Sequence, residues 1–233
     1  VTIYLSTLSG VLKWLKHARG FDIDERLALN ARAAMAHRAG VQTRGKIQDR
    51  LPKEGELEAL YSHWQAKGKR QKVPMELVCR ILLASGMRCG ELCRIRVEDL
   101  DQKAMTVVIR DRKDPRNKSG NDQTVPLILG AWELIEPLAK GRKVGFVIPN
   151  LNPHSVSNLF TRAAKACGFE GLTLHSLRHA AITEMFRQGL DIPTTSLVSG
   201  HKTLAQLKRY THTTPADVHR KLAEHKKLLT RQE

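Results

Sequence analysis

Two short stretches with a strand-like pattern set the fold class of this 233-residue chain. Residues 104–111 (AMTVVIRD) and 123–129 (QTVPLIL) are rich in β-branched and apolar residues, and the segment between them (RKDPRNKSGND) is full of turn formers. This arrangement predicts a β-hairpin. Most other apolar residues recur three and four positions apart, which is typical of helices that pack by one face. We therefore expect an α+β fold that is mostly α-helical, with one small antiparallel sheet.

Helical spacing predicts most of the remaining elements. Pro74 is expected to open a helix, because a proline at the first helical position loses no hydrogen bond, and Gly86 is expected to end it. A further short strand is expected at residues 145–149 (GFVIP). Helices are expected at about residues 3–18, 24–38, 53–64, 74–85, 89–95, 130–139, 154–167, 174–188, 193–198, 203–209 and 216–229.

The charge of the chain indicates its partner. The chain has 39 Lys and Arg against 23 Asp and Glu, a net charge of +16 and a pI of about 10. A surplus this large favours a polyanion, because neutralised phosphates release their counterions; a solvated basic surface is the alternative. No apolar run approaches the roughly 18 residues that a membrane span needs, and no signal-peptide pattern is present. We expect nucleic acid as the partner, no membrane, and a cytoplasmic location.

Cysteine and histidine spacing does not predict a metal site. Cys89 and Cys93 lie four apart in an apolar, helix-like stretch, without a second close pair. Reduced thiols in a cytosolic protein are therefore expected rather than zinc. His175 and His179 are also four apart, but no glutamate follows His175 as in the H-E-x-x-H pattern. We interpret His179 as a packed core histidine and expect neither a metal nor a cofactor.

Two segments hold arginines in distinctive surroundings. Ser85–Leu92 (SGMRCGEL) places Arg88 just after a glycine turn, and Leu174–His179 (LHSLRH) places His175 and Arg178 three apart, on one helix face. Taken alone, an arginine after a glycine turn is usually an exposed residue or a cap.

A third segment, residues 199–212, combines a Gly-His pair with a tyrosine. Tyr210 follows His201 by nine positions and is preceded by Lys208 and Arg209. Neighbouring cations favour the phenolate form, which is the nucleophile. Taken alone, Tyr210 would be an ordinary half-buried tyrosine.

In order, these segments resemble the tyrosine recombinase (phage integrase) family. The pattern reads G-x-R-x-x-E-L, a hairpin lysine, H-x-x-R-H, G-H and then a tyrosine. The resemblance implies a catalytic site in which Arg88 and Arg178 are the two arginines and His175 is the histidine of the H-x-x-R box. His201 fills the position at which the family carries His or Trp, and Tyr210 would be the nucleophile. It covers about residues 75 to 213.

The resemblance also implies a catalytic lysine on the hairpin, before a strand similar to x-V-P-L. That strand is residues 124–127 here, and Lys118 stands eight positions before Pro126. Lys113 is the competing choice, since this hairpin is longer than is usual in the family.

The same roles follow from phosphate chemistry. A phosphodiester under attack gains charge on its non-bridging oxygens, which two guanidiniums can hold through bidentate bonds. The tyrosine displaces the 5′ oxygen and forms a 3′-phosphotyrosyl link, and a lysine can protonate the departing alkoxide. The link stores the energy of the broken bond, so no ATP is needed. The arginines supply the charge that a metal would otherwise supply.

The resemblance implies an organisation as well. Residues 1–50 are expected to be the C-terminal remnant of a helical core-binding domain plus a linker, and residues 51–233 a catalytic domain with a C-terminal tail helix. The expected partner is double-stranded DNA at a specific recombination site, bound as a dimer to tetramer. Residues 214–233 either couple the subunits, as the resemblance implies, or pack back on their own domain. The alternatives are a type IB topoisomerase-like enzyme, which shares the fold and the tyrosine, and a non-catalytic DNA-binding module.

Overall fold

The computed structural model describes residues 2–38, 50–113, 120–203, 206–207, 210 and 223. The chain divides into two compact units, Val1–Gln48 and Asp49–Glu233. The predicted helix at residues 216–229 lies outside the described residues apart from Ala223. No helix in the described ranges is long and apolar enough to cross a membrane.

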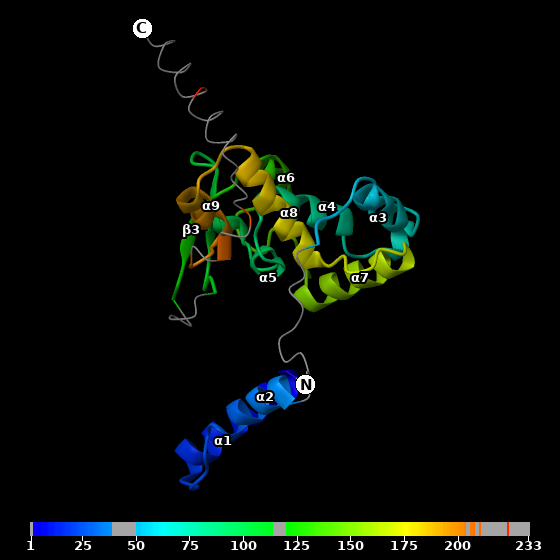
Figure 1. Ribbon diagram of the computed structural model, residues 1–233. Coiled ribbons are helices and arrows are strands. Elements are labelled where there is room, and N and C mark those ends of the chain that lie inside the picture. Colours follow the sequence, from blue (N-terminus) through cyan, green and yellow to red (C-terminus); the bar gives the residue numbers. More distant parts are fainter. Residues whose placement is uncertain are drawn as a thin grey trace. The chain divides into compact units, whose positions relative to one another are not determined.

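The first unit is a pair of helices, α1 (Thr2–Arg19) and α2 (Leu27–Arg38), which pack against each other (Figure 1). Arg32 of α2 donates a hydrogen bond to the hydroxyl of Ser6 in α1 at 3.3 Å. Ala28 is buried, whereas several large apolar side chains remain exposed, among them Ile3, Tyr4, Trp14 and Leu29. This pair therefore buries little apolar surface of its own.

The second unit is built around α4 (Met75–Ser85). This helix packs against α3 (Glu56–Gln65), α6 (Ala131–Ala139), α7 (Pro153–Ala166) and α8 (Leu174–Arg187). Each large apolar side chain that is fully buried contributes roughly 1.5–3 kcal/mol. Four that are completely buried come from four of these helices: Leu60, Val78, Phe160 and Leu177. The core therefore fixes the helices that carry the candidate arginines.

The hairpin prediction is confirmed, in a three-stranded antiparallel sheet. The strands β1 (Leu100–Asp101), β2 (Thr106–Ile109) and β3 (Gln123–Pro126) lie in that order, with Val107 opposite Val125. The predicted strand at residues 145–149 is wrong. Phe146 forms only an isolated bridge with Arg96, and the neighbouring main-chain bonds, from Val97 to Gly145 and from Val147 to Ile95, hold this segment as a loop.

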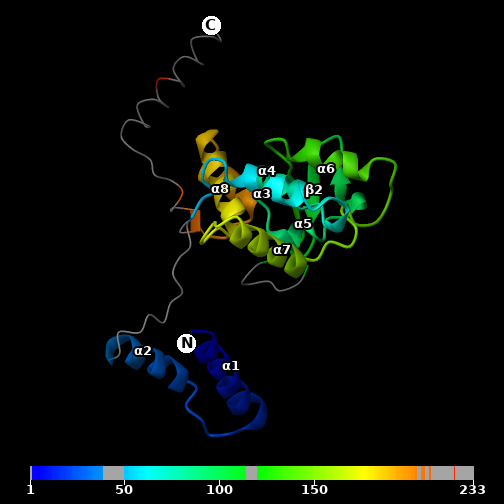
Figure 2. The same cartoon turned by 90° about the vertical axis from the view of Figure 1, so that its right-hand side faces the viewer.

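Shorter elements complete the second unit. They are α5 (Cys89–Leu92), α9 (Ile192–Ser199) and two 3₁₀ helices, Gly68–Arg70 and Val97–Asp99. Within this unit, α9 and β3 lie on one side of α8, while α3 and α7 lie on the other (Figure 1). Figure 2 shows the same elements after a quarter turn. The structure is mostly helical with a small antiparallel sheet, as expected.

Candidate active site

The turn between α4 and α5 presents Arg88. Gly86 ends α4 in the left-handed region, with φ 63° and its N–H bonded to the carbonyl of Leu82 at 3.0 Å. A Cβ at this position would press on the end of the Met185 side chain, so a glycine is favoured there. Arg88 is extended and precedes α5. Glu91 accepts from the Arg88 backbone N–H at 3.0 Å and from its Nη1 at 2.7 Å.

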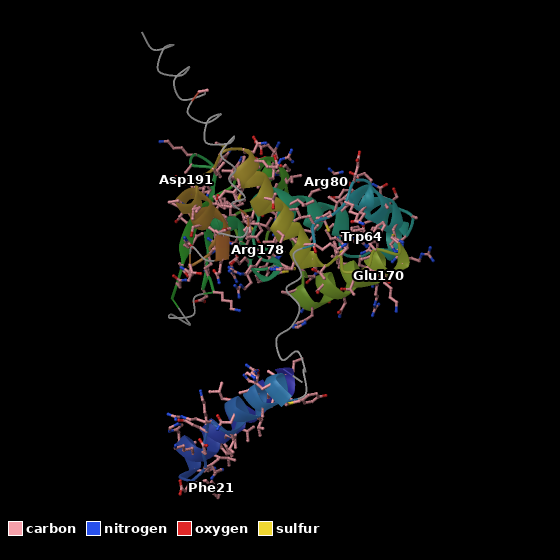
Figure 3. All side chains as sticks on the ribbon, in the orientation of Figure 1. Phe21, Trp64, Arg80, Glu170, Arg178 and Asp191 are labelled. Atoms are coloured by element: carbon pink, nitrogen blue, oxygen red, sulfur yellow. The ribbon has the colours of Figure 1, made fainter. Side chains whose placement is uncertain are left out.

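Helix α8 carries the second motif. His175 lies in its first turn and is exposed, whereas Arg178, one turn later, is only 4% exposed. Arg178 donates from Nη1 to the carbonyl of Gly86 at 2.6 Å and from Nη2 to the carbonyl of Ser199 at 2.8 Å. Figure 3 shows Arg178 in the middle of the second unit, with Trp64 in the part formed by α3 and α7. The first of these bonds joins two residues that are 92 positions apart in the sequence, and the second joins two that are 21 apart.

A pocket of about 300 Å³ brings three of the predicted residues together. Its lining includes Arg88, His175 and Arg178 beside apolar side chains of α4, α7 and the start of α8. The N-terminal end of a helix carries a partial positive charge, which adds to that of the two guanidiniums. The pocket is therefore suited to an anion.

The loop after α9 brings His201 to the same arginine. Gly200 caps α9 with φ 70°, and the His201 Nε2 lies 3.3 Å from Nη2 of Arg178. The other ring nitrogen, Nδ1, lies 2.7 Å from the hydroxyl of Ser199, and Ser196 donates to the His201 carbonyl at 2.5 Å. The imidazole is thus held from both sides.

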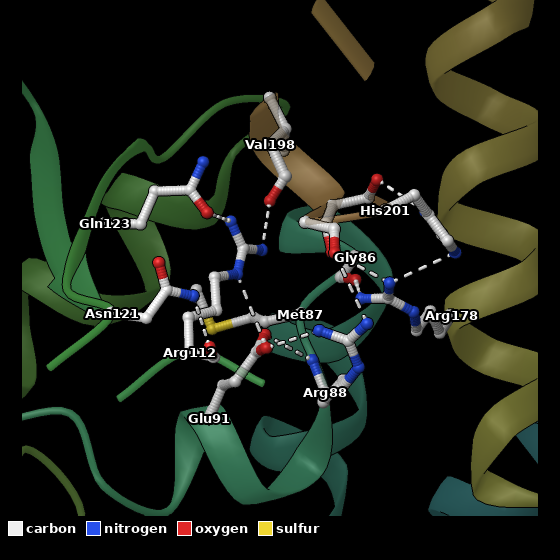
Figure 4. Close-up of polar contacts among 12 residues, drawn as sticks. Gly86, Met87, Arg88, Glu91, Arg112, Asn121, Gln123, Arg178, Val198 and His201 are labelled. Carbon is white, nitrogen blue, oxygen red and sulfur yellow. Dashed lines mark hydrogen bonds and ion pairs between the residues drawn. The ribbon is translucent and has the colours of Figure 1, made fainter. Parts of the chain in front are cut away.

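Three arginines point their guanidinium N–H groups at the carbonyls that end α9. Arg112 donates to the carbonyls of Leu197 (3.0 Å) and Val198 (2.6 Å), Arg178 donates to that of Ser199, and Arg88 approaches that of Gly200 at 3.4 Å. Helix C-termini leave such carbonyls without helical partners and carry a partial negative charge. Figure 4 shows this arginine cluster, which we define as Arg88, Arg112, Arg178 and Glu91.

Three members of the arginine cluster are buried and Arg88 is partly exposed, and their charges depend on one another. Burial raises the pKa of the Glu91 carboxyl, but the charges of Arg112 and Arg88 outweigh it and leave the pKa below its ordinary value. Burial lowers the pKa of Arg112. Burial and the charge of Arg88 lower the pKa of Arg178 to about 9, against the opposing effects of Glu91 and Tyr210. Arg178 therefore stays positively charged at pH 7.

Tyr210 contacts the second histidine of the H-x-x-R-H box. Its hydroxyl forms a hydrogen bond with Nδ1 of His179, and the two ring centroids are 5.5 Å apart. The His179 ring also meets that of His175 edge-on, with centroids 4.5 Å apart. His179 is buried, as expected for a core histidine, but its contact with the candidate nucleophile was not anticipated. We call Tyr210, His179 and His175 the tyrosine–histidine row.

The remaining site predictions have different outcomes. Lys118 lies outside the described residues, while the competing Lys113 is exposed and directly follows Arg112. The described residues contain no group of His, Cys, Asp and Glu side chains that could hold a metal ion. Arg112 was missed because it is one of several basic residues in the hairpin connection. Glu91 belongs to the first motif, but its place in that motif alone indicates no role for it.

Comparison with known proteins defines the class. The phage integrase family model matches residues 51–217, which is most of the chain. The chain therefore belongs to the phage integrase family, and the resemblance drawn from its motifs is confirmed.

Named relatives support this assignment. Tyrosine recombinase XerC of Corynebacterium glutamicum is 32% identical over 148 residues, which cover 58% of this chain and 45% of that protein. Tyrosine recombinase XerA of Pyrococcus horikoshii is 30% identical over 182 residues, covering 72% of this chain and 60% of that protein. The chain spans about half the length of the curated relatives it matches.

A solved structure shares the fold. The Tn1549 transposon integrase, in complex with transposon right end DNA, superimposes with a TM-score of 0.60 over 94% of this chain and 84% of that one, at 16% sequence identity.

Proposed function

We propose that this chain is the catalytic part of a site-specific tyrosine recombinase that cuts and rejoins DNA through Tyr210. The observation that carries the proposal is the pocket lined jointly by Arg88, Arg178 and His175, with His201 hydrogen-bonded to Arg178. Residues of two separate motifs thus line one pocket, and the third motif is linked to it through the bond between His201 and Arg178. The names of the relatives and the DNA in the Tn1549 complex support DNA as the substrate.

In the proposed reaction, Arg88 and Arg178 bind the non-bridging oxygens of one phosphodiester. Both guanidiniums are already oriented by the carbonyls of Gly86, Ser199 and Gly200, so little reorganisation accompanies the gain of charge in the transition state. His201 accepts a hydrogen bond from Arg178 through Nε2 and so helps to orient this guanidinium. The arginines supply the positive charge, so the scheme requires neither a metal nor a nucleotide.

Tyr210 would attack the phosphorus and form a 3′-phosphotyrosyl bond as the bond to the 5′ oxygen breaks. Its hydroxyl contacts His179, so we propose His179 as the immediate acceptor of the phenolic proton. His175, edge-on to His179 and on the pocket wall, would then orient a phosphate oxygen. The departing 5′ oxygen takes its proton from a hairpin lysine, Lys118 or Lys113.

Strand exchange requires four such sites, two on each duplex. We therefore propose that the chain assembles as a dimer and tetramer on its recombination site, with residues 214–233 coupling the subunits. We also propose that residues 1–50 are the end of a core-binding domain. A cytoplasmic, nucleoid-associated location is a further prediction. A truncation lacking residues 214–233 should impair assembly on DNA, measured by analytical ultracentrifugation, more than it impairs cleavage.

Covalent trapping tests the proposal. The chain is incubated with a pool of duplexes that carry a randomised core and a nick, so that the short fragment released by cleavage diffuses away and prevents religation. A protein–DNA adduct that survives denaturation is expected, with or without EDTA and without added nucleotide, and sequencing of the trapped DNA gives the preferred site.

The outcomes separate the alternatives. DNA binding without an adduct would indicate a non-catalytic DNA-binding module. An adduct accompanied by relaxation of supercoiled plasmid, but no strand exchange between two copies of the trapped sequence, would indicate a type IB topoisomerase-like enzyme. Loss of adduct on chelation, with rescue by a divalent cation, would contradict the proposed chemistry.

A further inference from the structure

Arg112 is a buried charge to which the proposed reaction assigns no role. Its side chain is only 1% exposed, although arginine is among the residues least often buried. Removing a guanidinium from water is costly unless hydrogen bonds and opposite charge replace the water. The contacts of Arg112 must therefore compensate that cost, and they show which parts of the fold it joins.

The side chain of Arg112 joins three elements of the second unit. It approaches Glu91 of α5 through Nε at 3.4 Å and donates to the side chain of Gln123 in β3 through Nη1 at 2.9 Å. It also donates to the carbonyls of Leu197 and Val198 at the end of α9. These groups lie on different sides of one planar fork, a geometry that guanidinium supplies and an ammonium group does not. Figure 4 shows Arg112 between Glu91, Gln123 and Val198.

The packing around this guanidinium leaves little freedom. A Cβ at Gly200 would collide with Cζ and Nε of Arg112, so the α9 loop closes onto the guanidinium itself. The same loop continues into His201, which is hydrogen-bonded to Arg178. A displacement of Arg112 would therefore also move the hairpin residues that it contacts and, through the α9 loop, the residues that line the pocket.

The main chain of Arg112 closes the base of the hairpin connection. Its N–H bonds to the carbonyl of Asn121 at 2.8 Å, and the side-chain amide of Asn121 donates to the carbonyl of Arg112 at 2.5 Å. Both lysine candidates, Lys113 and Lys118, lie between Arg112 and Asn121 in the sequence. The pair of Arg112 and Asn121 thus joins the two ends of the connection whose sequence contains both lysines.

We propose that Arg112 is a positioning residue that fixes the hairpin lysine relative to the phosphate held by Arg88 and Arg178. The inference rests on the proposed function, since it assumes that the lysine protonates the leaving 5′ oxygen. A displacement of about 1 Å can cost on the order of 10²-fold in rate when a reacting group must be aligned, so an anchor at the base of the hairpin has a large effect on a distant lysine.

The test compares two substrates that differ in one atom. The trapped duplex is made with an ordinary 5′-bridging oxygen and with a 5′-bridging sulfur, because a thiolate leaves without being protonated. Arg112→Lys keeps the charge and removes the fork. Asn121→Ala leaves the buried guanidinium in place and removes one bond at the hairpin base, so it tests the anchor even if Arg112→Lys folds poorly. Circular dichroism and thermal unfolding monitor the fold.

The matched control is Arg110→Lys. Arg110 lies two positions earlier, is half-exposed and pairs with Asp99 rather than with the arginine cluster. Lys113→Ala and Lys118→Ala identify which lysine is rescued by sulfur. We expect Arg112→Lys to slow cleavage of the oxygen substrate at least about tenfold more than that of the sulfur substrate, with Asn121→Ala showing the same pattern more weakly and Arg110→Lys showing none.

The outcomes for this inference differ from those for the proposed function. If the unaltered chain forms no adduct, the proposed function fails. If it forms an adduct and one lysine variant is rescued by sulfur, but folded Arg112→Lys and Asn121→Ala slow both substrates equally or neither, Arg112 does not act through the lysine and the inference is overturned.

Discussion

The arginine cluster and the tyrosine–histidine row meet at α8 but are held in different ways. In the arginine cluster, guanidiniums are fixed mainly by main-chain carbonyls: Arg178 by Gly86 and Ser199, and Arg112 by the end of α9. In the row, the Tyr210 hydroxyl contacts a side chain, His179, which lies one position after Arg178. A main-chain carbonyl has no rotamers and so stays in place. A contact between two side chains can be broken when either side chain changes its rotamer.

This difference matches the proposed division of labour. Groups that stabilise charge work best when their dipoles are already in place, because no reorganisation is then needed during the reaction. A nucleophile must instead leave its resting partner and travel to phosphorus. The arginines proposed to bind the phosphate are thus held mainly by main-chain groups, whereas the proposed nucleophile is held by a side chain.

Removing the nucleophile should have the largest effect. Tyr210→Phe deletes the oxygen that contacts His179 and little packing, so we expect no covalent adduct while DNA affinity and folding are retained. Denaturing gels of the nicked-duplex reaction and a binding titration measure the two properties. Tyr61→Phe is the matched control, because Tyr61 lies in the core beside Trp64, away from the row. An adduct formed by Tyr210→Phe would refute the assignment.

Changes in the arginine cluster should rank next. Arg88→Ala or Arg178→Ala should lower the cleavage rate by a factor on the order of 10² or more, the scale for losing one transition-state donor. Since both guanidiniums act on one phosphate, the double variant should lose less than the product of the single losses. Single-turnover rates give the values, with Arg187→Ala, an exposed arginine of α8, as the control. Near-normal rates in either single variant would exclude the pocket as the site.

The tyrosine–histidine row should be more tolerant. His179→Ala removes the proposed acceptor of the phenolic proton, and we expect the loss of this one group to slow cleavage about tenfold. For His179→Ala we expect this loss in cleavage rate together with a pH–rate profile displaced to higher pH. For His175→Ala the pH–rate profile should keep its shape. Cleavage rates from pH 6 to 10 distinguish them, with His63→Ala as the control. Identical pH–rate profiles for the two variants would contradict the role of His179 as the acceptor of the phenolic proton.

Much of the second unit follows from local rules. Pro74 and Gly86 bracket α4 as proline and glycine usually bracket a helix, and the alternating residues around the basic connection become β2 and β3. Strand β1 was missed because two residues, Leu100 and Asp101, are too few to show alternation. The strand predicted at residues 145–149 was wrong because the apolar Val147 and Ile148 are buried by loop packing rather than by a sheet.

The site follows the same division. Arg88, His175 and Arg178 could be predicted because their motifs have fixed spacing, and they line one pocket. Arg112 could not, because burial distinguishes it from its basic neighbours and burial depends on α9, more than 80 positions away. The contact of His179 with Tyr210 also depends on tertiary packing. In a single sequence, the position of His179 directly after Arg178 indicates only the helix face on which it lies, and not its partner.

The smallest expected effect concerns Glu91, the carboxylate of the arginine cluster. Burial disfavours its charge, but Arg112 and Arg88 favour it more, so its pKa in the folded chain lies below its ordinary value of 4.5. A carboxyl with a depressed folded pKa contributes stability above its unfolded pKa, and this contribution is lost as pH falls through the folded pKa. Glu91→Gln should therefore melt a few degrees lower than the unaltered chain at pH 7.

The gap between the two melting temperatures should close as the pH is lowered from about 5 toward 3, because a protonated Glu91 resembles glutamine. Differential scanning calorimetry across this range measures it. Glu184→Gln is the control, since Glu184 forms an exposed pair with Arg187 and should show little gap at any pH. A gap for Glu91→Gln that stays constant from pH 7 to pH 3 would mean that the carboxylate charge does not stabilise the arginine cluster, and that its guanidiniums are held by carbonyls alone.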